Sequence, residues 1–293
     1  MKKLLLLLMA SCSLLASAQQ VSVVQRTRLL STDAAFYPVL SPDGSQLLFS
    51  SADAQGLQLL NLNTGRVESI TTATSAGRDA KWGPDGNVYY VTQSRNAQNL
   101  TLRTAYRYDV ATGANTQLLA AQHGPVQPEV GTAGMAVNGP RKSYRSARNL
   151  GTSVRTQGSK VILTVNGKTR EFSPVESWAG YLWPSLSPDG TKVLFYAAEK
   201  GAVVIDLNGH VLSMLGRIEL PQWYNNDYIL GQRTTDDGHQ FTASHIELAK
   251  ADGSFRTNLT DEGSMTFQPT TAVGKIVYTT IDGQAYLMTI NIK

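Results

Sequence analysis

Cysteine is nearly absent from this chain, and histidine is scarce. The 293 residues contain one cysteine, Cys12, and four histidines. Without a second cysteine the chain forms no internal disulfide and no cysteine-rich zinc site. The sequence also has no G-x-S-x-G motif and no G-x-x-x-x-G-K-[ST] loop. These absences exclude an α/β-hydrolase nucleophile elbow and a P-loop nucleotide site, and we expect no cofactor.

Long apolar runs are also missing, except at the start. Met1-Lys2-Lys3 is basic, the segment from Leu4 to Ala16 is apolar, and Ala16-Ser17-Ala18 fits a small-x-small cleavage site. We predict a signal peptide at 1–18 and one mature domain at 19–293, exported to the periplasm of a Gram-negative bacterium, with no transmembrane span after signal removal. Alternatively, Leu8-Met9-Ala10-Ser11-Cys12 forms a lipoprotein box, and the protein is lipid-anchored through Cys12.

Charge of one sign does not dominate the mature chain. Removing Lys2 and Lys3 with the leader leaves 24 basic and 22 acidic side chains. This balance argues against a nucleic-acid partner, which requires a strong excess of basic residues. The densest basic stretch runs from Arg141 to Arg148. It is interpreted as a solvated loop or edge strand, or as a contact for an acidic partner or an anionic surface polymer.

A recurring tetrapeptide organises the rest of the chain. It reads Ser41-Pro42-Asp43-Gly44, Ser187-Pro188-Asp189-Gly190 and, with one change, Gly83-Pro84-Asp85-Gly86. Proline presets φ at the second position of a type I turn, Asp suits the third and Gly the fourth. Strands are expected just after the turns, at Gln46 to Ser50, Asn87 to Thr92 and Lys192 to Tyr196. Repeats of about 40 residues with several short strands predict a β-propeller.

The hairpin turns that precede the last strand of each repeat give a blade count. Five are found, at Asn63-Thr64-Gly65, Ala111-Thr112-Gly113, Asn166-Gly167, Asn208-Gly209 and Asp252-Gly253. A further strand, Arg26 to Ser31, has no hairpin, and the last repeat ends without an outer strand after Tyr286 to Asn291. We therefore predict an all-β, six-bladed propeller of four-stranded antiparallel blades. Its ring is closed by the N-terminal strand, and the region from Val130 to Ser173 forms one weak blade.

The repeats resemble those of the TolB-like six-bladed propeller family, whose WD-like repeat reads PxWSPDG. The resemblance is carried by the segments Tyr37 to Gly44, Trp183 to Gly190 and Asp79 to Gly86, and it covers essentially the whole mature chain. It implies the fold but is nearly silent about function, because propellers of this kind host scaffolds, lyases and the gating domains of peptidases.

Aligning the repeats on their first proline suggests a binding surface. Tyr37, Asp79, Trp183, Leu220 and Gln268 become equivalent, and Arg78 adjoins Asp79. All lie where an innermost strand should begin, at one mouth of the central channel, so we expect a recognition site there. Trp82 and Trp223, three positions after Asp79 and Leu220, are expected to pack between blades, and the same packing is an alternative for Trp183.

The functional hypothesis is a non-catalytic binding or scaffold protein of the cell envelope, a monomer that contacts an envelope protein partner. The alternative is a propeller enzyme that acts on polysaccharide, similar to the metal-dependent oligogalacturonate lyases. The weak candidates for its metal are Asp237 and His239, in the loop Thr234 to Gln240. Asp-Asp-Gly is also an ordinary turn sequence, and two such residues fall short of a usual ligand set, so no metal site is assigned.

Overall fold

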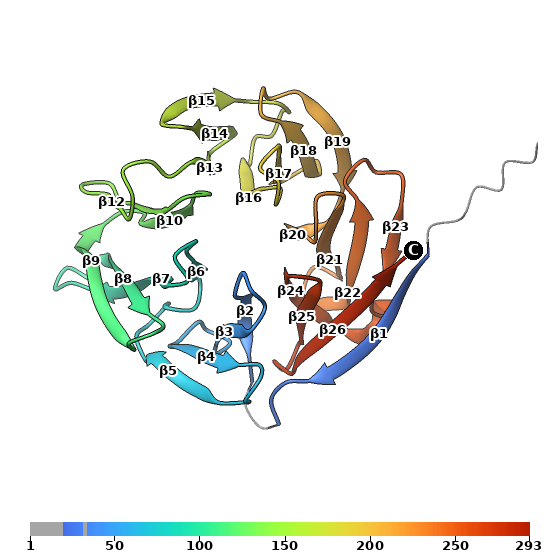
Figure 1. The fold of residues 1–293 in the computed structure, drawn as a ribbon, viewed down its shortest axis with the longest axis horizontal. Helices are drawn as coiled ribbons and strands as arrows, with labels where there is room; N and C mark the ends of the chain where they lie inside the picture. The colour runs from blue at the N-terminus through green and yellow to red at the C-terminus, as the bar shows by residue number, and fades with distance from the viewer. Residues whose placement is uncertain (1–19, 32–33) are drawn as a thin grey trace, which may run out of the picture.

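The computed structural model describes residues 20–31 and 34–293. The predicted signal peptide and Cys12 lie outside these residues. The described chain forms seven antiparallel sheets, arranged as the blades of a ring-shaped β-propeller (Figure 1). Within it the one helical element is the short 3-10 turn η1, Glu262–Ser264. No helix in this part of the chain is long and apolar enough to cross a membrane.

Four blades contain four consecutive strands, with the first strand innermost. Blade 1 consists of β2 Phe36–Leu40, β3 Gln46–Ser50, β4 Leu57–Asn61 and β5 Val67–Thr71. Blade 2 consists of β6 Lys81–Trp82, β7 Val88–Arg95, β8 Thr101–Asp109 and β9 Ala114–His123. Blade 5 consists of β16 Tyr181–Leu186, β17 Lys192–Ala197, β18 Gly201–Asp206 and β19 Val211–Gly216. Blade 6 consists of β20 Glu219–Trp223, β21 Tyr228–Asp236, β22 Phe241–Lys250 and β23 Arg256–Asn258.

The prediction of six four-stranded blades is wrong, because one expected repeat contributes two blades. Blade 3 consists of β10 Gln127–Val130, β11 Met135–Asn138 and β12 Tyr144–Arg145. Blade 4 consists of β13 Thr152–Gln157, β14 Lys160–Val165 and β15 Lys168–Phe172. Both have three strands, and β12 is only two residues long. Blade 3 has no outer hairpin and no Pro-Asp-Gly turn, so counting these turns found one blade where two exist.

The predicted closure of the ring by the N-terminal segment is confirmed. Blade 7 joins β1 Val21–Arg28 to β24 Thr266–Ala272, β25 Lys275–Thr280 and β26 Ala285–Ile292. The pairing of β1 with β26 is antiparallel and places Arg26 opposite Met288. The strand begins at Val21, before the expected Arg26, and ends at Arg28. Because the two ends of the chain share one sheet, the ring has no open edge where they meet.

The Pro-Asp-Gly segments form tight turns stabilised by their own side chains. The Gly44 amide donates to the Ser41 carbonyl (2.8 Å), and the Ser41 hydroxyl donates to Asp43 Oδ1 (2.5 Å). Asp43 also accepts from the Ser45 amide (3.1 Å), and these bonds, led by that from Ser41, lower its pKa to about 2. Asp189 repeats the pattern with Ser187 (2.6 Å). Gly44, Gly86 and Gly190 all have positive φ, which explains the glycine.

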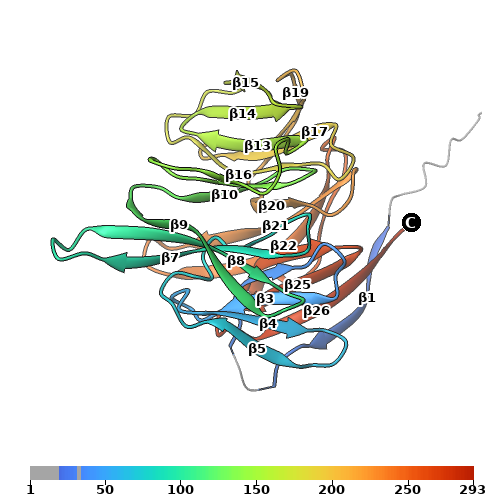
Figure 2. The ribbon, with the colours of Figure 1, turned by 60° about the vertical axis from the view of Figure 1, so that its left-hand side comes forward.

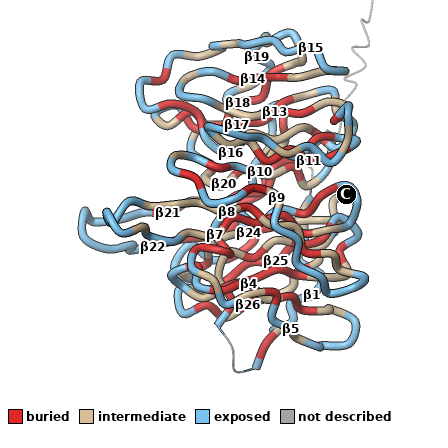
Figure 3. Tube along the Cα trace, turned by 90° about the vertical axis from the view of Figure 1, so that its left-hand side faces the viewer, coloured by how far each residue is buried: buried red, intermediate tan, exposed pale blue. Residues whose placement is uncertain are grey.

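Apolar packing between neighbouring blades stabilises the ring. The buried side chains form six clusters, each shared by two adjacent blades. Between blades 5 and 6, for example, Leu194 packs with Trp223 and Ile229. Another cluster, which includes Phe49 and Val277, joins blade 1 to blade 7. Figure 3 shows the buried positions running through the blades, with the exposed ones at the loops.

The interface between blades 3 and 4, here called the seam, is rich in polar contacts. None of the six clusters of described residues lies there. Instead, Thr132 and Thr152 form mutual hydrogen bonds, with the Thr132 amide 2.9 Å from the Thr152 carbonyl. Glu129 accepts bonds from Asn138 Nδ2 and Ser153 Oγ, both at 2.6 Å. Within the described chain, each of the other six interfaces between blades has an apolar cluster. Only the seam has hydrogen bonds in its place.

Two long hairpins extend from one face of the ring. In each blade of four strands the innermost strand begins on this face, here called the mouth face, and ends at the opposite one. The second strand returns, so the β7–β8 and β21–β22 hairpins lie on the mouth face. Figures 2 and 3 show hairpins projecting from this side of the ring. The Pro-Asp-Gly turns lie on the opposite face, because they follow the ends of innermost strands.

Cross-linking β1 to β26 tests ring closure. Ser22 and Asn291 are opposite each other in the pairing and both are exposed. In a Cys12→Ser chain, Ser22→Cys with Asn291→Cys should form an internal disulfide, because antiparallel partners lie within its reach. Oxidation should raise the free energy of unfolding by about 2–4 kcal/mol, measured with denaturant before and after reduction. The single-cysteine variants serve as controls, and failure to form the monomeric disulfide would contradict the pairing.

Glu247 gives a pH-dependent prediction. Its side chain is 1% exposed, its Oε2 lies 3.7 Å from Arg256 Nη1, and its Oε1 has no hydrogen-bond partner among the described residues. Burial raises the pKa of Glu247, with Arg256 opposing the shift. A raised pKa in the folded state means that stability falls as pH rises above the ordinary value of 4.5. Glu247→Gln should therefore raise the melting temperature near about pH 7.5, and the gain should vanish near about pH 4.

Glu171→Gln is the matched control for this measurement. Glu171 is exposed and bonded to Lys160 at 2.7 Å, which lowers its pKa. Because this shift has the opposite sign, removing the charge should give no gain at neutral pH. An equal gain in both variants, or a gain for Glu247→Gln that does not depend on pH, would refute the assignment.

Candidate functional site

Four innermost strands share an unusual backbone where they begin on the mouth face. Tyr37, Trp183, Leu220 and Gln268 each precede a proline and have φ between 49° and 53°. At the same points, the pairing of the first strand with the second shifts register. A left-handed residue is uncommon outside glycine, and a bulge of this kind bends the strand and redirects its side chains. Four of the five positions that the proline alignment made equivalent therefore share one backbone conformation.

Hydrogen bonds between blades hold three of these strands. The Gln268 amide donates to Gln232 Oε1 of blade 6 (2.6 Å), and the Tyr37 amide donates to Gln268 Oε1 (2.8 Å). Gln222 Nε2 donates to the Pro269 carbonyl (2.9 Å). The amide of a bulged residue is free of the strand ladder, and here a neighbouring glutamine satisfies it. Gln268 thus connects blades 6, 7 and 1 at the mouth.

The tryptophans divide into two classes. Trp82 and Trp223 are 7% and 8% exposed, and their indole nitrogens face carbonyls of the preceding blade, Val39 at 3.1 Å and Ser185 at 3.5 Å. They pack between blades. Trp183 is 40% exposed and lies against Tyr196 of its own blade, with ring centroids 5.3 Å apart. Trp178, in the loop before β16, is 90% exposed.

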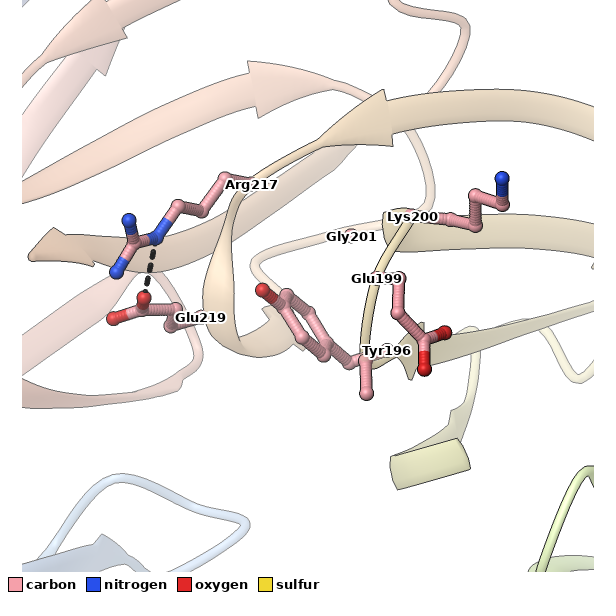
Figure 4. Close-up of a pocket in the computed structure, with 7 residues that line it drawn as sticks. Tyr196, Glu199, Lys200, Gly201, Arg217 and Glu219 are labelled. Carbon is pink, nitrogen blue, oxygen red and sulfur yellow. Dashed lines mark hydrogen bonds and ion pairs between the residues drawn. The ribbon is translucent and has the colours of Figure 1, made fainter. Parts of the chain in front are cut away.

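A cleft of about 330 Å³ adjoins this aromatic pair between blades 5 and 6. It is lined by Tyr196, the loop 198–201, Arg217 and Glu219 (Figure 4). Arg217 Nε lies 2.7 Å from Glu219 Oε1, and this bond raises the pKa of Arg217. Thr234 Oγ1 donates to Glu219 Oε2 (2.7 Å) and accepts from Arg217 Nη2 (3.1 Å). The bonded triad fixes one wall of the cleft.

The other wall carries an acid and a base, Glu199 and Lys200. In Figure 4 Tyr196 lies between the Arg217–Glu219 pair and the loop that bears Glu199 and Lys200. Glu199 Oε1 accepts from the Ala179 amide (2.9 Å), which holds the Trp178 loop against the cleft. Burial raises the pKa of Tyr196, so its hydroxyl stays protonated and able to donate. The cleft therefore offers an aromatic ring, hydrogen-bond donors and charges of both signs.

Arg78 and Asp79 differ from the other mouth residues. Both are exposed in the bend before β6, and Asp79 is followed by alanine instead of proline. Unlike the other four mouth residues, Asp79 does not have a positive φ. Its neighbour Lys81 is exposed on innermost strand β6. Blade 2 thus brings charge, not an aromatic ring, to the mouth.

Asp237 and His239 lie at the tip of the β21–β22 hairpin. Asp237 Oδ1 accepts from the amides of His239 and Gln240, both at 2.9 Å, and these bonds lower its pKa. The carboxylate is thus engaged in the turn itself. Across residues 20–31 and 34–293, no three His, Cys, Asp or Glu side chains gather in a group that could hold a metal ion.

Sequence reasoning placed Trp183 at the mouth but did not find the residues around it. Tyr196, Arg217 and Glu219 come from three strands or loops of two blades, and only the fold brings them together. Trp178 gave a usable signal, because a tryptophan between Ser177 and Ala179-Gly180 in a short polar loop has little core to enter.

Comparison with known proteins supports the fold alone. No protein-family model and no curated protein sequence matches the chain. TolB from Acinetobacter baumannii is 19% identical, with a TM-score of 0.56 over 83% of this chain, which spans 58% of that one. A putative TolB from Agrobacterium tumefaciens is 14% identical, with a TM-score of 0.53 over 94% of this chain and 99% of that one.

A lyase shows the same likeness. Virginiamycin B lyase from Staphylococcus aureus is 12% identical, with a TM-score of 0.58 over 92% of this chain and 99% of that one. Identities this low establish a shared architecture and no shared chemistry. The chain is a seven-bladed β-propeller that is structurally similar to the propellers of TolB and of lyases.

Proposed function

We propose that this chain is an exported, non-catalytic binding protein of the cell envelope, and that it recognises a partner protein through its mouth face. The observation that carries the proposal is the group of exposed aromatic side chains beside a polar cleft. Trp178 and Trp183 are 90% and 40% exposed, whereas Trp82 and Trp223 are buried. Exposed tryptophan and tyrosine beside arginine are the residues that contribute most to protein interfaces.

The backbone supports recognition by a prearranged surface. The bulge at Trp183 and the ring contact with Tyr196 fix the direction of the indole before any partner arrives. The Arg217–Glu219–Thr234 triad similarly fixes the neighbouring wall. Binding to ordered side chains costs less conformational entropy than binding to mobile ones. The charged groups of the cleft would then select the partner's orientation.

The leader supports the cellular setting. Its basic start, apolar core and small-x-small site are the three parts of a secretory signal. An exported propeller without cysteine in its mature part is suited to an oxidising compartment, because it has no thiol to oxidise. The periplasm is therefore part of the proposal, with lipid anchoring through Cys12 as its variant.

Photo-crosslinking in cells tests both the partner and the face. A photoreactive residue replaces Trp178, and in a second strain Asp189, which follows β16 at its opposite end. A partner that binds the mouth face should be captured from position 178 and not from position 189, and mass spectrometry of the envelope fraction identifies it. Capture of the same protein from both positions, or of no recurrent protein from either, would overturn the proposal.

Affinity for the captured partner should depend on the exposed rings. Trp183→Ala and Trp178→Ala should each weaken binding by about tenfold or more, because interface tryptophans are typical hot spots. Leu212→Ala is the matched control, since Leu212 is 53% exposed on the outer strand β19. All three variants should keep the wild-type melting temperature. Unchanged affinity in both tryptophan variants would exclude the mouth face as the binding surface.

A further inference from the structure

The seam between blades 3 and 4 encloses a small, positively charged cavity. Its volume is about 110 Å³, and its lining includes Arg145, Arg148 and Arg155 with one acid, Glu129. Pockets for drug-sized ligands are typically about 300–1,000 Å³. A cavity of this size admits only a small group, such as the charged end of a larger molecule.

Glu129 is already satisfied by its neighbours. Its side chain is 10% exposed and accepts hydrogen bonds from Asn138 and Ser153, both at 2.6 Å. Arg155 Nε lies 3.8 Å from Glu129 Oε2. The carboxylate therefore neutralises Arg155 and orients three donors of the cavity wall, and it has little capacity to attract a further cation.

Arg145 and Arg148 are the surplus charges. Both are exposed, and their guanidinium groups make no ion pair or hydrogen bond with any residue in the described chain. Arg145 belongs to β12 of blade 3, and Arg148 to the segment that leads into blade 4. After Glu129 is balanced against Arg155, two positive charges remain at the cavity. Arginine is the side chain best shaped to bind phosphate-like oxyanions in a two-pronged manner.

We propose that the seam is a binding site for a phosphate group, held by Arg145 and Arg148 from one side and oriented by the Arg155–Glu129 pair from the other. The site is independent of the mouth face. It also accounts for the polar character of the seam: an anion that contacts residues of both blades would join them where no apolar cluster does. Free inorganic phosphate and a phosphomonoester head group share the chemistry that fits.

Titration of the mature protein tests this proposal. Inorganic phosphate and glycerol 3-phosphate are added in separate experiments at constant ionic strength, with chloride as the comparison anion. Binding is measured by calorimetry, and the melting temperature is followed in parallel, because a ligand that binds only the folded state raises it. Saturable binding of both inorganic phosphate and glycerol 3-phosphate supports a phosphate site. Tighter binding of glycerol 3-phosphate would identify a phosphomonoester, and not free phosphate, as the natural ligand.

Two double variants decide whether the site is specific. Arg145→Gln with Arg148→Gln should weaken phosphate binding by about tenfold or more and abolish the phosphate-induced rise in melting temperature. Arg141→Gln with Lys142→Gln removes the same charge from the same exposed segment, but neither residue lines the cavity. This control should bind as the wild type does. Equal loss in both double variants would show diffuse attraction only, and absence of saturable phosphate binding in the wild type would overturn the proposal.

Discussion

Every blade of this propeller needs its neighbours, because the sheets away from the seam present apolar side chains to both sides. Leu47 and Phe49 of β3 pack toward blade 7, whereas Leu48 between them packs toward blade 2. The two-residue alternation of a strand thus supplies two different interfaces from one segment. A single blade could not bury both sets, so stability belongs to the closed ring. Closure depends on β1, which completes the blade whose other three strands end the chain.

This constraint also explains the backbone at the mouth. Innermost strands converge, so their first residues are crowded, and a bulge before a buried proline turns the chain away from the channel at Tyr37, Leu220 and Gln268. The amides released by the bulges are recovered by glutamines of adjacent blades. The same hydrogen bonds that stabilise the ring therefore order the mouth, and a surface ordered in this way is available for recognition at low entropic cost.

Local turn chemistry could be predicted from the sequence, and the number of blades could not. The Pro-Asp-Gly turn located β3 at Gln46–Ser50 as expected, because a tight turn determines where the next strand starts. Blade 3 lacks both that turn and an outer hairpin, and its third strand, Tyr144–Arg145, is too short to leave a periodic signal. Its existence depends on packing against blade 2 through Met135 and Val137, which no local pattern reports.

The candidate sites also divide into features that a local sequence pattern predicts and features that only the fold shows. Alignment on proline correctly grouped Tyr37, Trp183, Leu220 and Gln268, since the proline and the bulge share a cause, and it failed to predict the conformation at Asp79, where alanine follows. The cleft beside Trp183 joins residues from two blades, so it required the fold.

The basic stretch from Arg141 to Arg148 was visible as a run of charge, but no sequence pattern distinguished one of its basic residues from another. The fold separates them: Arg145 and Arg148 line the seam cavity with Arg155, whereas Arg141 and Lys142 do not. A run of basic residues can form a binding site only where another strand places a group that orients the basic side chains. Here that group is Glu129 on β10, which is paired with Arg155. The polar seam and the ordered mouth are alike in one respect. In both places hydrogen bonds between blades occupy some side chains and leave others available to bind a ligand or a partner.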